Sequence, residues 1–419
     1  MYLYILLIRI AALFGHRKAR LMLQGQKEIK AAIKDELSTF QGAIWIHVSS
    51  VGEFEQARPL IERLKEKGER TKVVLTFFSP SGYEMRKNYD KVDKVYYLPF
   101  ATRRNAKRFL VALQPKMAIF VKYEFWPAYL RELKKRQIKT YSISAIFREK
   151  QLFFRWWGKW YLKLLRCFTH IYVQDENSLA LLAKHGIPHV TIVGDTRFDR
   201  VQDVMKGLSN HERLIPVADF TEGAERVIVA GSTWPKDEEL LAQYMSQQLS
   251  DISHQTKLIL VPHEIDEKHL HFIFNLFQGR MVKYSAVSHH PSAVSRKNIL
   301  AQANVLVIDT MGLLSSIYRF GQVAYIGGGF GVGIHNTIEA AVYGVPVIFG
   351  PNYQHFREAK GLITAGGARS VKNYPELEAA LTTALEQHEE IGQKSADYVA
   401  AETGATEKIY EAILKNHKS

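Results

Sequence analysis

Short runs of β-branched and aromatic residues alternate along the chain with longer stretches in which apolar residues recur every three or four positions. The short runs are typical of buried strands, and the longer pattern is typical of amphipathic helices. The predicted strands form two series. The first is Ala43–Val48, Lys72–Phe77, Lys116–Val121, Lys139–Ile143, His170–Val173 and Val190–Val193; the second is Arg226–Ala230, Lys257–Val261, Val305–Ile308, Val323–Ile326 and Val345–Phe349.

Regular alternation of strand and helix predicts parallel sheets that are covered by helices on both faces. The two series are separated by a polar stretch between Asp199 and Glu225, and 419 residues are many for one domain. We therefore expect an α/β protein with two Rossmann-like domains facing a central cleft. The end of the chain, from Pro375 to Ser419, has a helical pattern, and in two-domain folds of this kind it can cross back to the first domain.

The N-terminal segment "MYLYILLIRIAALFG" is apolar except for Arg9, and basic residues follow it. It is shorter than the about 20 apolar residues of a full span. It also lacks the preceding charge and the cleavage site of a signal peptide. We expect a helix that dips into a membrane, with its basic end on the cytoplasmic side. The alternative is an amphipathic helix packed on the domain.

A second segment, Arg148–Phe168, interleaves tryptophans with basic residues in a helical pattern. Such a helix suits the headgroup level of a membrane. It equally suits a helix that is buried on one face and solvated on its basic face.

The net charge of +14 is unevenly distributed. Residues 1–200 hold 37 Lys and Arg against 18 Asp and Glu, a net +19, whereas residues 201–419 carry −5. The first half is therefore expected to meet an anionic surface. No nucleic-acid-binding motif is present, which favours a membrane or an anionic lipid over nucleic acid. Cys167 is the only cysteine, which excludes an intrachain disulfide and a cysteine-based zinc site.

Two acids follow predicted strands of the first half, at the edge where a parallel sheet forms its crevice. Glu53 comes after "WIHVSSVG" and Glu124 after "AIFVKY". Two such carboxylates can divide base and electrostatic roles. The alternative for Glu53, and for Glu55 beside it, is an acid that complements a helix dipole. Arg197, in "GDTRFDR", is a candidate cation for a leaving phosphate.

The second half has the features of a nucleotide-binding domain. Gly231, Ser232 and Thr233 lie between a strand and a helix, where small residues admit phosphate oxygens, although a plain capped turn has the same composition. Further candidates at strand ends are Pro262, His263, Asp309, Thr310, Met311 and Gly312.

The glycine-rich stretch "GGGFGVGIHNTIEAAVYGVPVIFGPNY", from Gly327, is not G-x-G-x-x-G. Asn336 is expected to begin a helix with Glu339 three residues on, as in a capping box. Gly344 is expected to end that helix.

Metal-binding patterns are missing from the sequence. His263, His269 and His271 do not have H-E-x-x-H spacing, and no D-x-D pair is present to hold Mg²⁺ against a nucleoside diphosphate. We expect no bound metal and no cofactor.

The motifs S-x-G-E, E-x-W-P, G-D-x-R-F-D, G-S-T, V-P, D-T-M-G and G-G-G-F…H-N-x-x-E…G-x-P-V-I-F-G-P occur in this order. Together they resemble the 3-deoxy-D-manno-octulosonic acid (Kdo) transferases of lipopolysaccharide synthesis, which have the two-domain GT-B fold. The resemblance implies an inverting transfer of Kdo from CMP-Kdo to a lipid A precursor, with no cofactor and no nucleic acid partner.

The resemblance also implies roles for individual residues. Glu53 matches the general base, and Glu124 and Arg197 match residues that stabilise the transition state. The residues implied in nucleotide binding are Ser232, Thr233, Pro262, His263, Met311, Gly312, Leu313, Asn336, Thr337, Ile338 and Glu339.

The sequence departs from the family pattern at Arg197, where Lys is common, and at His263 and Leu313, where Arg and Glu are usual. The last two changes fall in the nucleotide motifs, so another GT-B transferase with a different nucleotide sugar and a lipid acceptor stays an alternative. A non-catalytic membrane-bound scaffold is a third.

The expected organisation is a membrane-associating helix over 1–20, an acceptor-binding domain over 21–205, a nucleotide-sugar domain over 206–400 and a C-terminal helix over 401–419. We expect the protein at the cytoplasmic face of the inner membrane, held there by its N-terminus.

Overall fold

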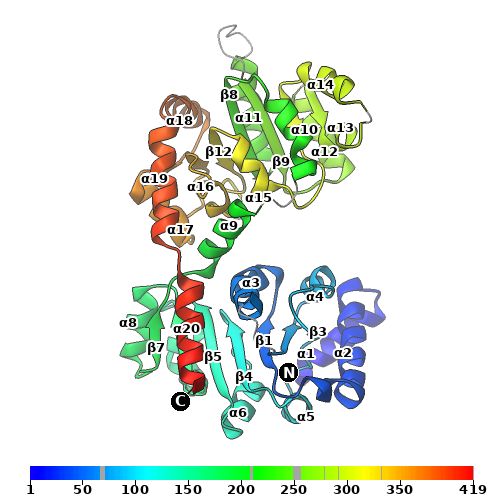
Figure 1. Cartoon of the computed structure of the whole chain (residues 1–419), viewed down its shortest axis with the longest axis vertical. Coiled ribbons are helices and arrows are strands. Elements are labelled where there is room, and N and C mark those ends of the chain that lie inside the picture. Colours follow the sequence, from blue (N-terminus) through cyan, green and yellow to red (C-terminus); the bar gives the residue numbers. More distant parts are fainter. Residues whose placement is uncertain are drawn as a thin grey trace. The chain divides into compact units, whose positions relative to one another are not determined.

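The computed structural model of the chain describes residues 1–66, 71–207, 211–248, 256–277, 279–290, 292–331 and 333–418. The chain divides into two units, Met1–Arg200 with Thr403–Ser419 and Val201–Glu402 (Figure 1). Each unit is built around one parallel sheet, as the alternating pattern predicts.

The sheet of the first unit has, within the described residues, seven parallel strands in the order β3-β2-β1-β4-β5-β6-β7. The strands are β1 (Ile44–Val48), β2 (Val73–Phe77), β3 (Lys94–Tyr97), β4 (Met117–Val121), β5 (Lys139–Ala145), β6 (His170–Val173) and β7 (Val190–Ile192). The order reverses between β1 and β4, where Ile44 lies opposite both Val73 and Met117. Such a reversal opens a crevice at the carboxyl edge of a sheet.

The helices of the first unit cover both faces of this sheet. They are α1 (Tyr2–Leu13), α2 (Arg17–Asp35), α3 (Val51–Glu66), α4 (Pro80–Arg86), α5 (Arg103–Leu113), α6 (Pro127–Lys135), α7 (Lys159–Leu165), α8 (Glu176–Lys184), α20 (Ala405–Lys418) and the start of α9 (Thr196–Lys206).

Successive residues of β1 point to opposite faces of the sheet. Because helices cover both faces, the strand is buried along its whole length. Trp45 belongs to the core under α2, α5 and α6, whereas Ile46 belongs to the core under α3. The C-terminal helix α20 adds Ile409 and Tyr410 to the α3 side (Figure 1). Burial of side chains of this size stabilises by about 1.5–3 kcal/mol each.

The sheet of the second unit also has seven parallel strands among the described residues, in the order β10-β11-β9-β8-β12-β13-β14. They are β8 (Arg226–Thr233), β9 (Thr256–Pro262), β10 (Met281–Lys283), β11 (Val305–Val307), β12 (Val323–Ile326), β13 (Val347–Phe349) and β14 (Ala368–Ser370). Its helices are α10 (His211–Thr221), α11 (Pro235–Gln248), α12 (Glu267–Leu276), α13 (Tyr284–Ser288), α14 (Ala293–Ala301), α15 (Leu314–Ile317), α16 (Ile338–Ala341), α17 (Arg357–Ala365), α18 (Tyr374–Glu386) and α19 (His388–Ala401). The strand order reverses between β8 and β12.

The strands predicted from the sequence are all present, and β3, β10 and β14 were not predicted. The segment Arg148–Phe168, predicted as one helix, is different: it forms 3₁₀ turns at Leu152–Phe154 and Trp156–Gly158 and then the short helix α7. The chain folds back on itself at Gly158 instead of continuing as a helix. A Cβ there would be 1.6 Å from the carbonyl oxygen of Leu152, so this close approach requires glycine.

Helix α1 packs against α2 through one side only, and none of its residues is buried. Ile5 and Ile8 pack partly on the core, whereas Leu3 and Leu13 are 68% and 83% exposed. Among the described residues, no helix is both long and apolar enough to cross a membrane.

Candidate functional site

Glu53 lies in the first turn of α3, directly after β1 and beside the reversal of strand order. Its Oε2 accepts hydrogen bonds from the backbone N–H groups of Ser49, at 2.5 Å, and Ser50, at 3.1 Å. Burial raises the pKa of Glu53, and the nearby charge of Glu124 raises it further, against the lowering effect of these N–H groups and of His47. A carboxylate with a raised pKa is better suited to accept a proton near neutral pH.

Glu55, two residues further along α3, has a different environment. Its carboxylate pairs with Arg86, at 2.9 Å, with Arg200, at 3.2 Å, and with Arg58, at 3.7 Å. This ion-pair cluster gives Glu55 a structural role. The geometry therefore separates two acids that the sequence places in the same turn.

Glu124 follows β4 and is 8% exposed. Its Oε2 lies 3.1 Å from Nε2 of His47, and it accepts a hydrogen bond of 2.5 Å from the indole N–H of Trp126. Nδ1 of His47 lies 2.9 Å from the hydroxyl of Thr76 on β2. His47 is fully buried in β1 and holds the carboxylate in place, a role that sequence reasoning missed. The signal was a histidine inside an apolar strand.

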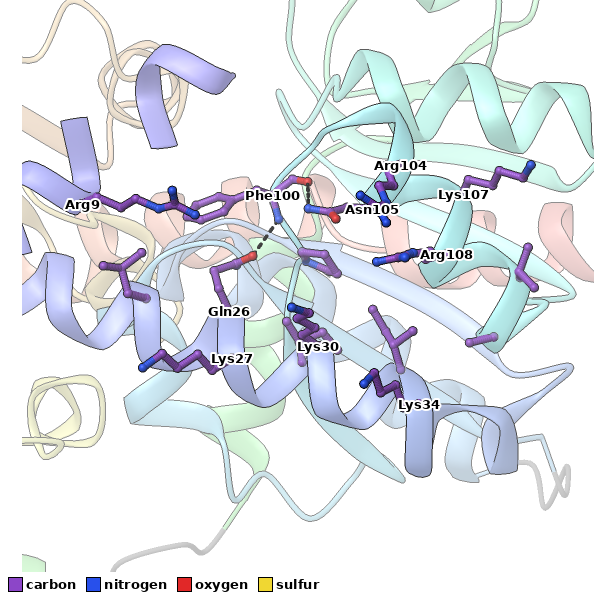
Figure 2. A pocket seen from close by; sticks show the side chains of 16 residues that line it. Arg9, Gln26, Lys27, Lys30, Lys34, Phe100, Arg104, Asn105, Lys107 and Arg108 are labelled. Carbon is purple, nitrogen blue, oxygen red and sulfur yellow. Dashed lines mark hydrogen bonds between the residues drawn. The ribbon is translucent and has the colours of Figure 1, made fainter. Parts of the chain in front are cut away.

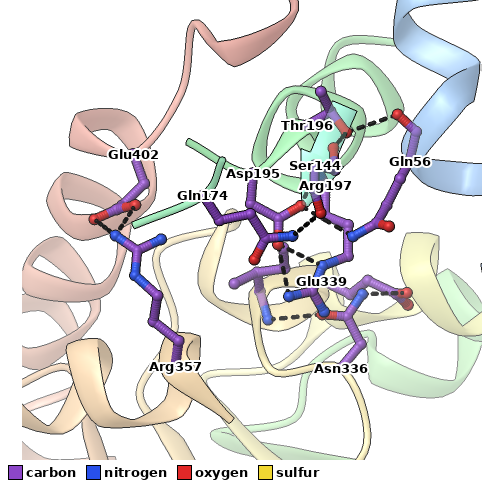
Figure 3. A network of polar contacts seen from close by, with 11 residues as sticks. Gln56, Ser144, Gln174, Asp195, Thr196, Arg197, Asn336, Glu339, Arg357 and Glu402 are labelled. Atoms are coloured by element: carbon purple, nitrogen blue, oxygen red, sulfur yellow. Dashed lines mark hydrogen bonds and ion pairs between the residues drawn. The ribbon is translucent and has the colours of Figure 1, made fainter. Parts of the chain in front are cut away.

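Arg197 is held by Asp195, which was not predicted. The guanidinium donates to Oδ2 of Asp195 from Nε at 2.9 Å and from Nη2 at 2.7 Å. Figure 3 shows that Oδ1 of Asp195 also accepts from the side chain of Gln56, at 3.3 Å. Burial opposes ionisation of Asp195, but Arg197 lowers its pKa below the usual value. The pair keeps one guanidinium fixed at the carboxyl edge of the first sheet.

The neighbouring hydroxyls and amides continue this network (Figure 3). Thr196 donates to the carbonyl oxygen of Gln56 at 2.6 Å and lies 3.0 Å from the hydroxyl of Ser144. Gln174 donates to the carbonyl oxygen of Ser144 at 3.0 Å. Ser144 has a φ of +51°. Left-handed backbone at a non-glycine residue is costly and is frequent at functional sites.

In the second unit, the strand order reverses between β8 and β12. Backbone segments from different loops pack closely together there. A Cβ on Gly327 would lie 2.3 Å from the carbonyl oxygen of Ser232. A Cβ on Gly329 would lie 2.6 Å from Cα of Gly350. Ser232 has a φ of +54°, and the pairing with β9 shifts register around it. A bulge of this kind re-aims backbone and side chains at the end of a strand.

Three aromatic rings form a stack at this edge. The ring of His263 lies 4.7 Å from that of Trp234 and 4.6 Å from that of His335. The indole N–H of Trp234 donates to Nε2 of His335 at 3.2 Å. Burial lowers the pKa of His335, and the neighbouring His263 lowers it further. The stack was missed because Trp234 and His335 lie far apart in sequence.

Asp237, in the first turn of α11, connects the loops of this edge. Its Oδ2 accepts from the backbone N–H of Gly328 at 2.8 Å and of Trp234 at 2.9 Å. Its Oδ1 accepts from the hydroxyl of Tyr325 at 2.7 Å. Burial raises the pKa of Asp237, and the three donors oppose this effect. The sequence signal was an acid two residues after the Pro that begins a helix.

The other predicted nucleotide-binding residues differ in exposure. Thr233 is buried and donates to Glu238 at 2.9 Å, so its hydroxyl serves the turn. Leu313, Thr337 and Ile338 are also buried, and Pro262 ends strand β9. Met311 is 71% exposed and precedes Gly312, which has a φ of +85°.

The predicted capping box at Asn336 is wrong. Helix α16 begins at Ile338, and Thr337, which precedes it, makes no side-chain capping bond. The side-chain amide of Asn336 instead donates to Oε1 of Glu339 at 2.8 Å (Figure 3). The carbonyl side of the same amide accepts from the N–H of Ile338 at 3.3 Å. Asn336 therefore orients the carboxylate of Glu339.

Within the part of the chain that the structure describes, no group of three His, Cys, Asp or Glu side chains is arranged to hold a metal ion. The candidate residues are instead carboxylates with a guanidinium in the first unit, and backbone N–H groups with aromatic rings in the second.

Solved structures share this architecture. They include UDP-GlcNAc 2-epimerase from Neisseria meningitidis, with 16% identity, a TM-score of 0.63 and coverage of 89% of this chain and 100% of that one. A glycosyltransferase from Rickettsia africae has 14% identity, a TM-score of 0.58 and coverage of 90% and 99%. The fold is thus that of the GT-B class, with two α/β domains on parallel sheets.

The sequence comparisons point to one family of glycosyltransferases. The profile described as 3-deoxy-D-manno-octulosonic-acid transferase matches residues 15–200. Curated Kdo transferases of Aquifex aeolicus and Rickettsia prowazekii are 26% and 27% identical to the chain, over 85% and 88% of it and 90% and 76% of their own lengths. The chain thus carries a Kdo transferase domain over residues 15–200 and is similar to Kdo transferases over most of its length.

Proposed function

We propose that this glycosyltransferase moves Kdo from CMP-Kdo to a hydroxyl of a lipid A precursor, with Glu53 as the general base. The observation that carries the proposal is the position of Glu53, which lies at the reversal of strand order and has a pKa raised by burial. Unlike Glu55, it is held by backbone N–H groups rather than by arginines.

The proposed reaction is a single displacement. The acceptor hydroxyl gives its proton to Glu53, and its oxygen forms a bond to the anomeric carbon of Kdo. The bond from that carbon to the phosphate oxygen breaks, and CMP leaves with the electron pair. An inverting transfer of this kind needs one base, and fixed charges that stabilise the leaving phosphate lower the barrier.

Arg197 and Glu124 supply such fixed groups in the proposal. Arg197 is already oriented by Asp195, so its positive charge needs no reorganisation when negative charge develops on the leaving phosphate. Glu124 is oriented by His47 and Trp126, and its charge helps to raise the pKa of Glu53.

For the donor, we assign the carboxyl edge of the second sheet. Close-packed glycines and the bulge at Ser232 shape this edge, and the carboxylate of Glu339, oriented by Asn336, suits ribose hydroxyls. The ring of His263 offers a stacking face and a polar edge.

A second candidate is the transfer of a different nucleotide sugar. It is favoured by His263 and Leu313, which stand where the family motifs carry Arg and Glu, so that one cation and one carboxylate are replaced. This alternative predicts a different preference among nucleotides.

We further propose that the protein works at the cytoplasmic face of the inner membrane. Helix α1 supports this, because its outer face is apolar and exposed while α2 begins with basic residues. Twelve helical residues extend for about 18 Å, less than the about 30 Å of a hydrocarbon core. The helix thus dips into the membrane surface in this proposal.

The decisive experiment incubates the protein with CMP-Kdo and a tetra-acylated, bis-phosphorylated lipid A precursor and follows the acceptor by mass spectrometry. The expected result is a mass increase by whole Kdo units. In parallel, thermal unfolding is measured with CMP, UDP and GDP. Protection by CMP alone supports the proposal, whereas protection by UDP or GDP without CMP supports the second candidate.

A further inference from the structure

A pocket of about 900 Å³ lies between α2 and α5 of the first unit, and the proposed transfer gives it no role. Lys27, Lys30 and Lys34 of α2 line one side (Figure 2). Arg104, Lys107 and Arg108 of α5 line the other, and α1 adds Arg9. None of the described residues that line it is Asp or Glu.

The walls of the pocket are fixed by specific contacts. The side chain of Gln26 on α2 donates to the carbonyl oxygen of Leu98 at 2.8 Å and accepts from the N–H of Phe100 at 2.8 Å. On the α5 side, Asn105 donates to the carbonyl oxygen of Phe100 at 3.0 Å (Figure 2). A Cβ on Gly25 would lie 2.1 Å from the ring of Tyr97, so α2 can approach the strand β3 only with glycine at this position.

The positive charges that line the pocket destabilise the protein when no anion is bound. Lys27, Lys30 and Lys34 repeat at helical spacing, and like charges at such spacing repel each other. Arg104 lies in the first turn of α5, where the helix dipole disfavours a cation and where no acid is present. In the described chain, no carboxylate forms an ion pair with any of the seven cations. A bound anion would remove this repulsion.

The floor of the pocket is apolar. Ile29 and Phe100 are buried lining residues, whereas Ile33 and Val111 add more exposed apolar surface to the walls. A cationic rim above an apolar floor fits an amphiphile better than a free ion, because the floor can bury methylene groups while the rim binds charge.

We propose that the pocket binds the phosphate-bearing headgroup of an anionic membrane lipid, with the acyl chains directed along α1. Arg9 connects the two features, because it lines the pocket from a helix whose exposed residues are largely aliphatic. On that face Leu7 is 55% exposed and Leu13 is 83% exposed. The proposal rests on the suggested membrane contact of α1, but not on the transfer reaction.

A nucleic acid would also complement the positive charge, but not the adjoining surface. Binding of single strands relies on aromatic side chains on which bases stack. Helix α1 exposes mainly leucine and isoleucine, with Tyr2 and Phe14 near its two ends, a composition that suits the interface and acyl boundary of a bilayer.

The test measures sedimentation of the full chain with phosphatidylcholine vesicles, with and without phosphatidylglycerol. The pocket variant combines Lys30→Gln, Arg104→Gln and Arg108→Gln. Its matched control combines Lys91→Gln, Lys135→Gln and Lys184→Gln, which remove the same charge from exposed positions elsewhere in the unit. One basic residue near an anionic bilayer contributes about fivefold to binding, so the pocket variant is expected to bind about a hundredfold more weakly. The control is expected to bind almost as well as the unchanged protein.

A second variant, Ala112→Phe, keeps every charge and fills part of the pocket. Reduced binding to phosphatidylglycerol vesicles is expected, with thermal unfolding as the check on folding. Equal losses in the pocket variant and its control would show diffuse attraction and overturn the proposal, as would unchanged binding of Ala112→Phe. An RNA oligonucleotide that binds more tightly than the vesicles would identify another occupant and overturn it too.

A third variant separates this proposal from the membrane contact itself. Leu3→Ser, Leu7→Ser and Leu13→Ser together remove apolar side chains from the exposed face of α1. If these changes abolish vesicle binding and the pocket variant retains it, the membrane contact stands and the pocket proposal fails. Loss in both supports the proposal.

Discussion

The two places where strand order reverses have different electrostatics. At β1 and β4 the side chains carry full charges: Glu53, Glu124 and, at the same edge, the ion pair of Asp195 with Arg197. At β8 and β12 the chain presents glycines and aromatic rings, and one of its buried acids, Asp237, binds backbone N–H groups. Among the described residues, both edges belong to seven-stranded parallel sheets with the same kind of strand order, so the side chains and not the fold make the difference.

The two buried aspartates express this difference as opposite pKa shifts. Asp195 has a guanidinium beside it, which lowers its pKa in spite of burial. Asp237 has N–H and O–H donors only, and burial raises its pKa. In the proposed reaction, charges are concentrated where the proton moves, and dipoles are concentrated where the donor phosphate binds. This division fits a base in the first unit and donor binding in the second.

The largest expected effect comes from Glu53→Gln. The amide keeps the size of the side chain but cannot accept the proton, so the transfer rate should fall by about 10²–10⁴-fold. The rate is measured in a single turnover with CMP-Kdo and the lipid A precursor. Protection by CMP in thermal unfolding should be unchanged.

Glu55→Gln is the matched control, because it alters the same turn. It loses ion pairs with Arg86 and Arg200, and each such pair is worth at most about 1 kcal/mol at an exposed position. Transfer should stay within a few fold of the unchanged enzyme. Equal rates for the two variants would remove Glu53 as the base.

The next largest effect concerns the glycines. Gly327→Ala places a Cβ 2.3 Å from the carbonyl oxygen of Ser232, and the loop must move. We expect a loss of about 1–3 kcal/mol in the free energy of unfolding, together with weaker donor binding. Gly52→Ala in the first unit meets only the hydroxyl of Ser50, at 4.0 Å, and should raise helix stability by a fraction of about 1 kcal/mol. Similar losses in both variants, measured by urea denaturation, would show that the two edges are not built differently.

Asp237→Asn should have an intermediate effect. Asn has one acceptor oxygen, so it cannot accept from Gly328, Trp234 and Tyr325 as the carboxylate does. Leaving a buried donor unpaired costs about 1–3 kcal/mol. Calorimetry should show weaker binding of CMP. Asp266→Asn is the control, because Asn is an equally good helix cap, and unaltered binding in both variants would contradict the role given to Asp237.

The sequence predicted the fold well because strands buried on both faces are continuous apolar runs, as in "AIWIHV" and "MAIFV". It did not predict β3, β10 and β14, because strands of three or four residues show too little of a periodic pattern. In β14, which is Ala-Arg-Ser, the strand conformation comes from pairing with β13 rather than from composition.

The candidate site was predictable in part for a similar reason. Residues directly after strands, such as Glu53 and Glu124, share one edge by topology alone. The partners that orient them come from distant segments: His47 lies 77 positions from Glu124, and Trp234 lies 101 from His335. Periodicity carries no information on such pairs. The environment that separates Glu53 from Glu55 also depends on arginines of other elements.

The smallest expected effect is a displacement of the pH profile. Because burial and Glu124 raise the pKa of Glu53, the acid limb of kcat/KM should lie above the usual range of a glutamate and fall tenfold per pH unit below that pKa. Glu124→Gln removes the charge that raises this pKa, so the limb of the slower variant should move to lower pH. The raised pKa also means that the folded protein binds the Glu53 proton more tightly than the unfolded chain does. This group therefore stabilises the fold increasingly as pH falls through its folded pKa, an increase that Glu53→Gln should abolish in denaturation curves. An acid limb that stays in place in Glu124→Gln would show that the two carboxylates are not coupled, and the contrast between charged and dipolar edges would then rest on Asp195 and Arg197 alone.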